Sequence, residues 1–322
     1  MDSKVVTRGI NMKEKLVVIV GPTAVGKTKL SIEMAKRVHG EIISGDSMQV
    51  YRNMDIGTAK ISVEEMEGIP HHLLDIKNPD EAYSAAAFQS EVKRCVTDIT
   101  SRGKLPILVG GSGLYIQAVL YDYHFSKQER NEAITAKLER QIELEGIMSL
   151  YTRLTEVDPE QAKKIHPNNH RRVVRALEIY EATGGTMTEL QKNQRKELQF
   201  EVQLVGLEME RQLLYDRINN RVDEMIEKGL VSEVRQLVAE GYGECQSMQA
   251  IGYKELIPYI EGQCSMEEAI ETLKQNSRRY AKRQYTWFKN KLDINWYSVE
   301  PETINEKFRI IINDLAGFLK ER

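Results

Sequence analysis

The pattern of hydrophobic and polar positions changes along this chain of 322 residues. In the first third, short unbroken apolar runs such as 16–20 and 106–109 alternate with longer segments of helical periodicity. An unbroken apolar run is typical of a strand that is buried on both faces of a parallel sheet. The pattern predicts strands at 16–20, 41–44, 71–76 and 106–109, and helices from residue 27 and over 85–100. This alternation predicts an α/β fold of doubly wound type, a parallel sheet flanked by helices.

From about residue 123 the pattern becomes helical without strands, which predicts an inserted all-helical domain over 123–200. One of its helices is expected to begin after the asparagine pair 168–169 and to end at the glycine pair 184–185. A helical wheel places three arginines of this helix on one side and its apolar residues on the other. The arginines are Arg171, Arg172 and Arg175, and the apolar residues are Val173, Val174, Leu177 and Tyr180.

An alternating segment at 201–209 predicts a strand that rejoins the sheet after the insertion. Helices follow, including a long one over 266–290, and Trp296 with Tyr297 predicts a short closing strand. The expected domains are therefore 1–122 as the first part of the core, 123–200 as the insertion, and 201–322 as the return to the core with C-terminal helices.

Residues 21–28 follow the first predicted strand and match the phosphate-binding pattern G-x-x-x-x-G-K-[ST]. The glycines allow a tight turn whose backbone N–H groups point at an anion, and the next helix adds its positive N-terminal end. The lysine supplies a point charge to phosphate, and the final hydroxyl is a ligand for Mg²⁺. The loop predicts a P-loop NTPase-like core and a diphosphate or triphosphate ligand. Its members are Gly21, Pro22, Thr23, Ala24, Val25, Gly26, Lys27 and Thr28.

The composition is that of an ordinary globular protein, with 41% hydrophobic and 29% charged residues. No run approaches eighteen uncharged apolar residues, so no membrane span is expected. Residues 1–13 are expected to form a loosely attached leader, and 1–15 contain no apolar signal core. The three cysteines, Cys95, Cys245 and Cys264, are far apart, which argues against a zinc site or disulfides and favours the cytoplasm.

The net charge of −3 hides two clusters of basic residues. Segment 163–175 contains five Lys/Arg and segment 278–291 contains six, and neither contains an acid. A single run of this kind is usually a solvated helix face. Two runs in a nearly neutral chain favour a surface that follows the phosphates of a nucleic acid.

Asp46 follows the second predicted strand, at the edge of the sheet where the phosphate loop is expected. A carboxylate there could hold Mg²⁺ or act as a general base towards a nucleophile. It could also simply cap a helix or stabilise its loop. The strand at 106–109 ends in Gly-Gly-Ser-Gly, without the acidic residue that P-loop ATPases, GTPases and small-molecule kinases usually carry.

The chain resembles the tRNA dimethylallyltransferases, or tRNA isopentenyltransferases, over about residues 15–297. The matching segments are 21–28, Asp46–Ser47 with Tyr51, 54–60, 70–75, 110–115, 165–168, 175–178, 251–253 and 281–288. The number and order of these segments make the resemblance specific. It implies transfer of a dimethylallyl group from dimethylallyl diphosphate to N6 of the adenosine next to the anticodon on its 3′ side, position 37. It also implies Mg²⁺ as cofactor.

The resemblance implies a role for individual residues. Asp46 is the expected base for the adenine amino group, and Thr23 is expected to hydrogen-bond within the diphosphate or reaction site. Asp46, Thr23 and Arg221 are the expected catalytic residues. Ser112 stands where relatives often have threonine. The implied tRNA contacts are Asp46, Ser47, Met48, Gln49, Ser112, Arg171, Arg172, Val173, Val174, Arg175, Gln249, Ala250, Ile251, Gly252, Tyr253, Lys254, Arg278, Lys282 and Arg283. Segment 124–136 matches relatives poorly, so no contact is expected there.

Arg221 is the expected diphosphate-binding arginine, because helical spacing places it beside Leu214, Ile218 and Met225 on an inward face. A buried arginine needs an anionic partner, which is either the diphosphate or a buried carboxylate. Arg217 is the second choice. His71 could line the channel, although a histidine beside a strand is more often structural.

Three other functions stay open on the sequence alone. An adenylate isopentenyltransferase would share the core but would have little use for the inserted domain and the basic faces. A P-loop small-molecule kinase would turn over ATP and ignore dimethylallyl diphosphate. A non-enzymatic P-loop module would bind tRNA without forming a product. A monomer that binds tRNA and dimethylallyl diphosphate is expected.

Overall fold

The computed structural model describes residues 13–123, 131–193 and 197–320. The expected leader at 1–13 lies outside this range except for its last residue, as does much of segment 124–136. The described residues form two compact units, 121–197 and the remainder of the chain, which are described separately. The unit at 121–197 corresponds to the insertion that the sequence predicted at 123–200.

Six strands form one fully parallel sheet in the order β3-β2-β4-β1-β5-β6. Val17 at the centre pairs with Ile107 on one side and with Gln203 on the other. The strand at 201–208 therefore rejoins the sheet beside β1, as the sequence predicted, and the predicted parallel α/β fold is confirmed. The strands are β1 Lys15–Val20, β2 Gly40–Ser44, β3 His71–His72, β4 Leu105–Gly110, β5 Glu201–Glu208 and β6 Asn295–Ser298.

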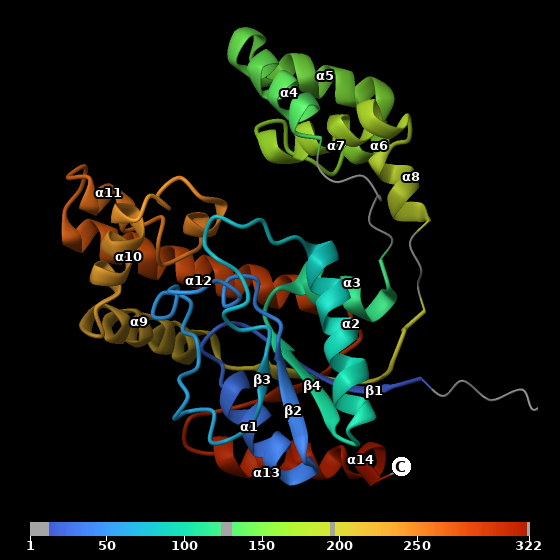
Figure 1. Cartoon of the computed structure of the whole chain (residues 1–322), viewed down its shortest axis with the longest axis vertical. Coiled ribbons are helices and arrows are strands. Elements are labelled where there is room, and N and C mark those ends of the chain that lie inside the picture. Colours follow the sequence, from blue (N-terminus) through green and yellow to red (C-terminus); the bar gives the residue numbers. More distant parts are fainter. Residues whose placement is uncertain (1–12, 124–130, 194–196, 321–322) are drawn as a thin grey trace, which may run out of the picture. The chain divides into compact units, whose positions relative to one another are not determined.

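Helices cover the sheet on both sides (Figure 1). The crossover from β1 to β2 and the crossover from β3 to β4 run in opposite directions across the sheet. Because such crossovers are right-handed, their helices α1 and α2 lie on opposite faces. The first unit contains α1 Lys27–Val38, α2 Ala85–Ser101, α3 Gly113–Tyr121, α9 Arg211–Glu227, α10 Leu230–Ala239, α11 Ile257–Ile260, α12 Met266–Lys291, α13 Ile304–Asp314 and α14 Ala316–Lys320, with a 3₁₀ turn at Gln246–Gln249.

The core between the sheet and α1 fixes the start of the phosphate loop. Val17 and Ile19 of β1 are fully buried against Leu30 and Met34 of α1 and Phe308 of α13. α1 begins at Lys27, directly after the loop, so the packing of this helix aims its N-terminus at the carboxyl edge of the sheet.

The predicted strand at 71–76 is wrong after its second residue. Only His71 and His72 pair with β2, through Ile42 and Ile43. Leu73 and Asp75 have φ values of 64° and 53°, which lie in the left-handed region and turn the chain out of the sheet. The chain turns here and leaves Asp75 to bind the Lys60 ammonium group at 2.6 Å.

The second unit is a small helical bundle with its own core. Leu138, Leu150, Leu154 and Leu177 are fully buried in it. The predicted ends of α7 are confirmed, because the Asn169 side chain accepts a hydrogen bond from Arg172 N and Gly184 ends the helix with φ 72°. The unit contains α4 Glu132–Glu145, α5 Ile147–Val157, α6 Pro159–Ala162, α7 His170–Thr183 and α8 Met187–Lys192.

Across the described ranges, no helix combines the length and the apolar character needed to cross a membrane. The cysteines of these ranges, Cys95, Cys245 and Cys264, are all free thiols.

Candidate active site

The phosphate loop is a tight turn between β1 and α1 whose glycines cannot be replaced without strain. Gly21 and Gly26 have φ values of 148° and 108°. A Cβ atom on Gly21 would lie 2.5 Å from the carbonyl oxygen of Leu207, which belongs to β5. The strand that returns after the insertion therefore packs directly against the loop, and only glycine allows that approach.

Lys27 is directed back over this loop. Its Nζ donates hydrogen bonds to the carbonyl oxygens of Gly21 at 3.0 Å and Pro22 at 2.7 Å. Burial, together with the nearby positive charge of Arg221, lowers the pKa of the Lys27 ammonium group to about 7, although Asp46 acts in the opposite direction. An anion in the loop would oppose this shift, since its negative charge would stabilise the buried ammonium group.

Asp46 lies at the end of β2, on the same edge of the sheet as the loop. Its Oδ1 accepts a hydrogen bond from the Met48 amide at 2.8 Å, so it also stabilises its own turn. Burial raises the pKa of Asp46, although the Met48 amide and the positive charge of Lys27 act against that shift. A carboxylate with a raised pKa is a stronger proton acceptor than an exposed one.

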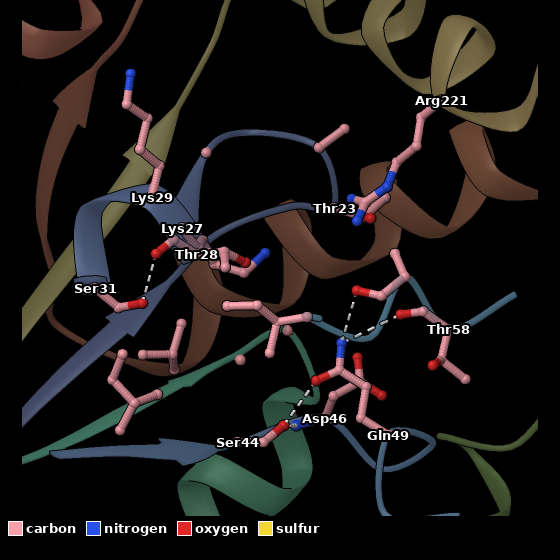
Figure 2. Close-up of a pocket in the computed structure, with 18 of the residues that line it drawn as sticks. Thr23, Lys27, Thr28, Lys29, Ser31, Ser44, Asp46, Gln49, Thr58 and Arg221 are labelled. Atoms are coloured by element: carbon pink, nitrogen blue, oxygen red, sulfur yellow. Dashed lines mark hydrogen bonds between the residues drawn. The ribbon is translucent and has the colours of Figure 1, made fainter. Parts of the chain in front are cut away.

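Arg221 points inward from α9, as its helical spacing predicted. Figure 2 shows its guanidinium group directed from the helix towards Thr23. Among the residues that the structure describes, it has no ion-pair or hydrogen-bond partner, and burial lowers its pKa. No carboxylate of the described residues pairs directly with Arg221, although the charges of Glu224 and Asp46 partly offset the lowering of its pKa. Arg217 lies on the same helix, and its Nε donates to the carbonyl oxygen of Ala24 at 2.9 Å.

Two cavities meet at these side chains. The loop cavity, of about 490 Å³, is lined by Lys27, Thr28 and Arg217, and also by His71. The second cavity, of about 290 Å³, is lined by 249–252 and by apolar side chains of α9 such as Met225. Six residues line both cavities: Thr23, Asp46, Thr58, Ala59, Arg221 and Tyr280. The three residues expected to be catalytic thus lie at the junction.

Gln284 and Tyr280 of α12 also belong to this site, although neither was among the residues expected to form it. Gln284 Oε1 accepts a hydrogen bond from Thr23 N at 2.9 Å, and its Nε2 donates to the carbonyl oxygen of Gly111 at 3.1 Å. It therefore fixes the phosphate loop to the segment that follows β4. Tyr280 lines both cavities, and burial raises its pKa. The sequence contains one signal for these two residues. Gln284 lies within the segment 281–288 that resembles the family, and Tyr280 lies just before it.

Several expected tRNA contacts of the first unit line the second cavity. They are Ser47, Met48, Gln249, Ala250, Ile251, Gly252 and Arg283. Ser112 lies beside them, since its Oγ accepts a hydrogen bond from Ser47 N at 3.3 Å. Gln49 lines the loop cavity, while Lys254 and Lys282 are exposed outside both cavities.

Two expected contacts need correction in this unit. The side chain of Tyr253 has no exposed surface, and its hydroxyl donates to Glu233 at 2.6 Å, so it supports the cavity wall instead of touching a ligand. Arg278 is less available than the basic run suggested, because it donates to Asn219 at 2.6 Å and pairs with Glu271 at 3.0 Å.

The basic face predicted for α7 is present in the second unit. Arg171 and Arg172 are exposed, while Arg175 pairs with the buried Glu178 at 2.8 Å. Val173 and Val174 are 0% and 2% exposed, so their expected contact with tRNA is wrong for the side chains. They form the core that supports the arginines.

The residues of the loop cavity fit a magnesium ion only in part. Thr28 and Asp46 both line the loop cavity and offer oxygen ligands of the kind that Mg²⁺ prefers. Within the described ranges there is no group of three or more His, Cys, Asp or Glu side chains that would bind a metal. Mg²⁺ commonly combines one or two protein oxygens with water and phosphate oxygens, so these residues suit a metal that arrives with a diphosphate.

The lowered pKa of Lys27 predicts a pH-dependent advantage of this residue in binding pyrophosphate. A lysine with a pKa of about 7 is charged below pH 7 and loses its proton above it. The ratio of dissociation constants, Lys27→Met over wild type, should therefore be largest near pH 6 and fall as the pH rises to about 8.5. Titration calorimetry with Mg²⁺ and pyrophosphate measures it, and the titration of the ligand itself cancels in the ratio. A ratio that does not change with pH would contradict the assignment.

Comparison with known proteins agrees with this geometry. A family model described as IPP transferase matches residues 49–291. A protein of Oceanobacillus iheyensis named tRNA dimethylallyltransferase is 62% identical over 311 residues, which cover 97% of this chain and 99% of the relative. The crystal structure of a full-length tRNA isopentenylpyrophosphate transferase from Bacillus halodurans is 51% identical, with a TM-score of 0.72, and covers 96% of this chain and 98% of that chain.

A third similar structure comes from a crystallographic study of a eukaryotic dimethylallyltransferase acting on tRNA. It is 34% identical with a TM-score of 0.81, and the match covers 95% of this chain and 80% of that chain. The family model spans the insertion and α12, and each of the three relatives matches at least 95% of this chain. The chain therefore belongs to the IPP transferase family.

Proposed function

We propose that this enzyme transfers a dimethylallyl group from dimethylallyl diphosphate to N6 of the adenosine at position 37 of tRNA, giving N6-isopentenyladenosine. The observation that carries the proposal is the junction of the two cavities, where Asp46, Thr23 and Arg221 line both. The loop cavity suits the diphosphate of the donor. The second cavity, which opens beside 249–252, suits the adenosine.

The donor step is the departure of pyrophosphate. The C1–O bond of the allylic donor breaks, and its electron pair leaves with the pyrophosphate oxygen. Preorganised positive groups stabilise such charge most strongly where water is excluded. The loop amides, Lys27 and Arg221 would serve this purpose, and Mg²⁺ held by Thr28 would add a Lewis acid when it is bound.

The acceptor step is attack of N6 on the allylic carbon. A bond forms between N6 and C1, and one N6 proton passes to the Asp46 carboxylate. The adenine amino group is a weak nucleophile, because its lone pair is conjugated with the ring, so removal of this proton lowers the barrier. The adenosine must leave its stack to enter the second cavity, as in other enzymes that modify a base.

Nucleoside mass analysis tests the proposal. The protein is incubated with tRNA, dimethylallyl diphosphate and Mg²⁺, and the digested tRNA is expected to contain adenosine with one added five-carbon prenyl group. Ribonuclease fragments should place the product next to the anticodon. Prenylated AMP or ATP with unmodified tRNA would instead indicate the adenylate enzyme, and ATP turnover without prenylation would indicate a kinase.

The exposed arginines of α7 predict a salt-dependent contribution to tRNA binding. Replacing Arg171 and Arg172 with glutamine should weaken tRNA binding and reduce the slope of log K against log salt concentration by about 1 for each phosphate that is no longer neutralised. The affinity for pyrophosphate should not change. Filter binding over a salt series measures the effect, and Lys192→Gln, an exposed lysine of the same unit already paired with Glu160, is the control. Unchanged tRNA affinity would make this face ordinary solvated surface.

A further inference from the structure

One segment that lines both cavities is the loop at residues 54–60, called here the 54–60 loop. Thr58 and Ala59 line both cavities, and Gly57 lines the second. Gln49 Nε2 donates to the carbonyl oxygens of Thr58 at 3.2 Å and Ala59 at 3.3 Å (Figure 2). Gln49 comes three residues after Asp46, so the loop is tied on this side to the turn that carries the carboxylate.

On its other side the 54–60 loop is held by Glu233 of α10. Glu233 Oε2 accepts hydrogen bonds from the amides of Asp55 at 3.0 Å and Ile56 at 2.8 Å. Its Oε1 accepts from the Gly57 amide at 3.1 Å and from the Tyr253 hydroxyl at 2.6 Å. Three successive amides that converge on one anion form a nest, and hydrogen bonds to a charged acceptor are the strong kind.

Close packing fixes the loop further. A Cβ atom on Gly57 would lie 2.5 Å from the ring of Tyr253, so the ring rests directly on the backbone. Gly252, which has a φ of 106°, brings its own backbone close to the carbonyl oxygen of Gly57. Glu233 and Tyr253 thus determine where Gly57 and its neighbours stand, although neither side chain lines a cavity.

We propose that Glu233 is a positioning residue that holds the 54–60 loop as the wall against which the acceptor adenosine is placed beside Asp46. The inference rests on the proposed function, since it concerns the acceptor of that reaction. A carboxylate is needed because four donors converge on two oxygens, and a carboxylate only accepts. A glutamine in its place has one oxygen, so its NH₂ group would face at least one backbone N–H.

The expected result for Glu233→Gln is a fall of about 10- to 100-fold in kcat/KM for tRNA, because a displacement of the wall by about 1 Å misaligns the reacting atoms. KM for tRNA should rise and kcat should fall. The dissociation constant for Mg²⁺-pyrophosphate should remain within about threefold, since the phosphate loop is untouched. Tyr253→Phe removes one of the four donors and should shift the same parameters in the same direction by a smaller factor.

Hydrogen exchange gives the direct structural readout. The amides of residues 55–57 should exchange faster in Glu233→Gln, while those of the phosphate loop keep their wild-type rates. Glu240→Gln is the matched control, because Glu240 lies at the end of the same helix and bonds only Gln236 among the described residues. It should behave as wild type in every measurement.

The inference is overturned if Glu233→Gln keeps wild-type KM and kcat. It is also overturned if its loss of activity equals its loss of folded protein, with KM unchanged. If Glu233→Gln does not fold, Tyr253→Phe decides, and wild-type parameters for that variant overturn the inference. A wild-type protein that makes no prenylated tRNA would instead refute the proposed function, so the two failures are distinguishable.

Discussion

Asp46→Ala is expected to lower the turnover of tRNA prenylation by about 10²–10⁴-fold, the usual contribution of a positioned general base. Asp46 lines both cavities, and its pKa is raised by burial, so it is placed and tuned to accept a proton. The affinity for tRNA should stay within a few fold, because the loss concerns the reaction and not the phosphate contacts. Single-turnover kinetics with saturating donor measures the rate.

Asp46→Asn is the matched variant for this experiment. Its side-chain oxygen can still accept the Met48 amide, which Asp46 Oδ1 accepts at 2.8 Å, so the turn is kept while the base is lost. The asparagine variant should therefore be as slow as the alanine variant, but it should melt at a higher temperature. Rates near wild type for either variant would remove Asp46 from the mechanism.

Lys27→Met is expected to weaken binding of Mg²⁺-pyrophosphate by about 10- to 100-fold, which corresponds to one charge-assisted hydrogen bond in a buried site. Methionine keeps the length of the apolar stem but cannot donate to phosphate. The rate of the reaction should fall further, since the same group stabilises the departing pyrophosphate. Calorimetry gives the binding constant, and rapid quench gives the rate.

The control for Lys27 is Lys29→Met on the same helix. Lys29 also lines the loop cavity, but it is exposed, and its Nζ donates to Asn305 Oδ1 at 2.6 Å. Figure 2 shows it directed away from Asp46 and Arg221. Pyrophosphate affinity should be nearly unchanged in this variant. A loss as large as that of Lys27→Met would mean that general positive charge, and not a directed contact, binds the diphosphate.

The fold was predictable where local pattern and tertiary structure agree. Strands β1 and β4 are buried on both faces, and their unbroken apolar runs show it directly. The predicted third strand failed because its end is decided by backbone turns at Leu73 and Asp75 and by the bond of Asp75 to Lys60. No periodicity in 71–76 records those long-range contacts.

The site was predictable where the position of a residue in the sequence indicates where its side chain lies. Lys27 and Asp46 follow strands that end on one edge of the sheet, and the spacing of Arg221 with Leu214 and Ile218 already points it inward. Gln284 and Tyr280 were less accessible, because helical periodicity does not distinguish a side chain that faces a cavity from one in the core. Glu233 gave no signal at all, since its partners are backbone amides at 55–57.

The position of β5 beside β1 also bears on how the chain is made. Until residue 208 has left the ribosome, β1 lacks one neighbour, and the backbone at Gly21 lacks the Leu207 carbonyl against which it rests. A nascent or truncated chain that ends within the insertion would present β1 as an open edge rich in Val and Ile, a template for association with other chains. Such fragments should aggregate, and the ligand-binding half of the protein should not be separable from the residues that come after the insertion.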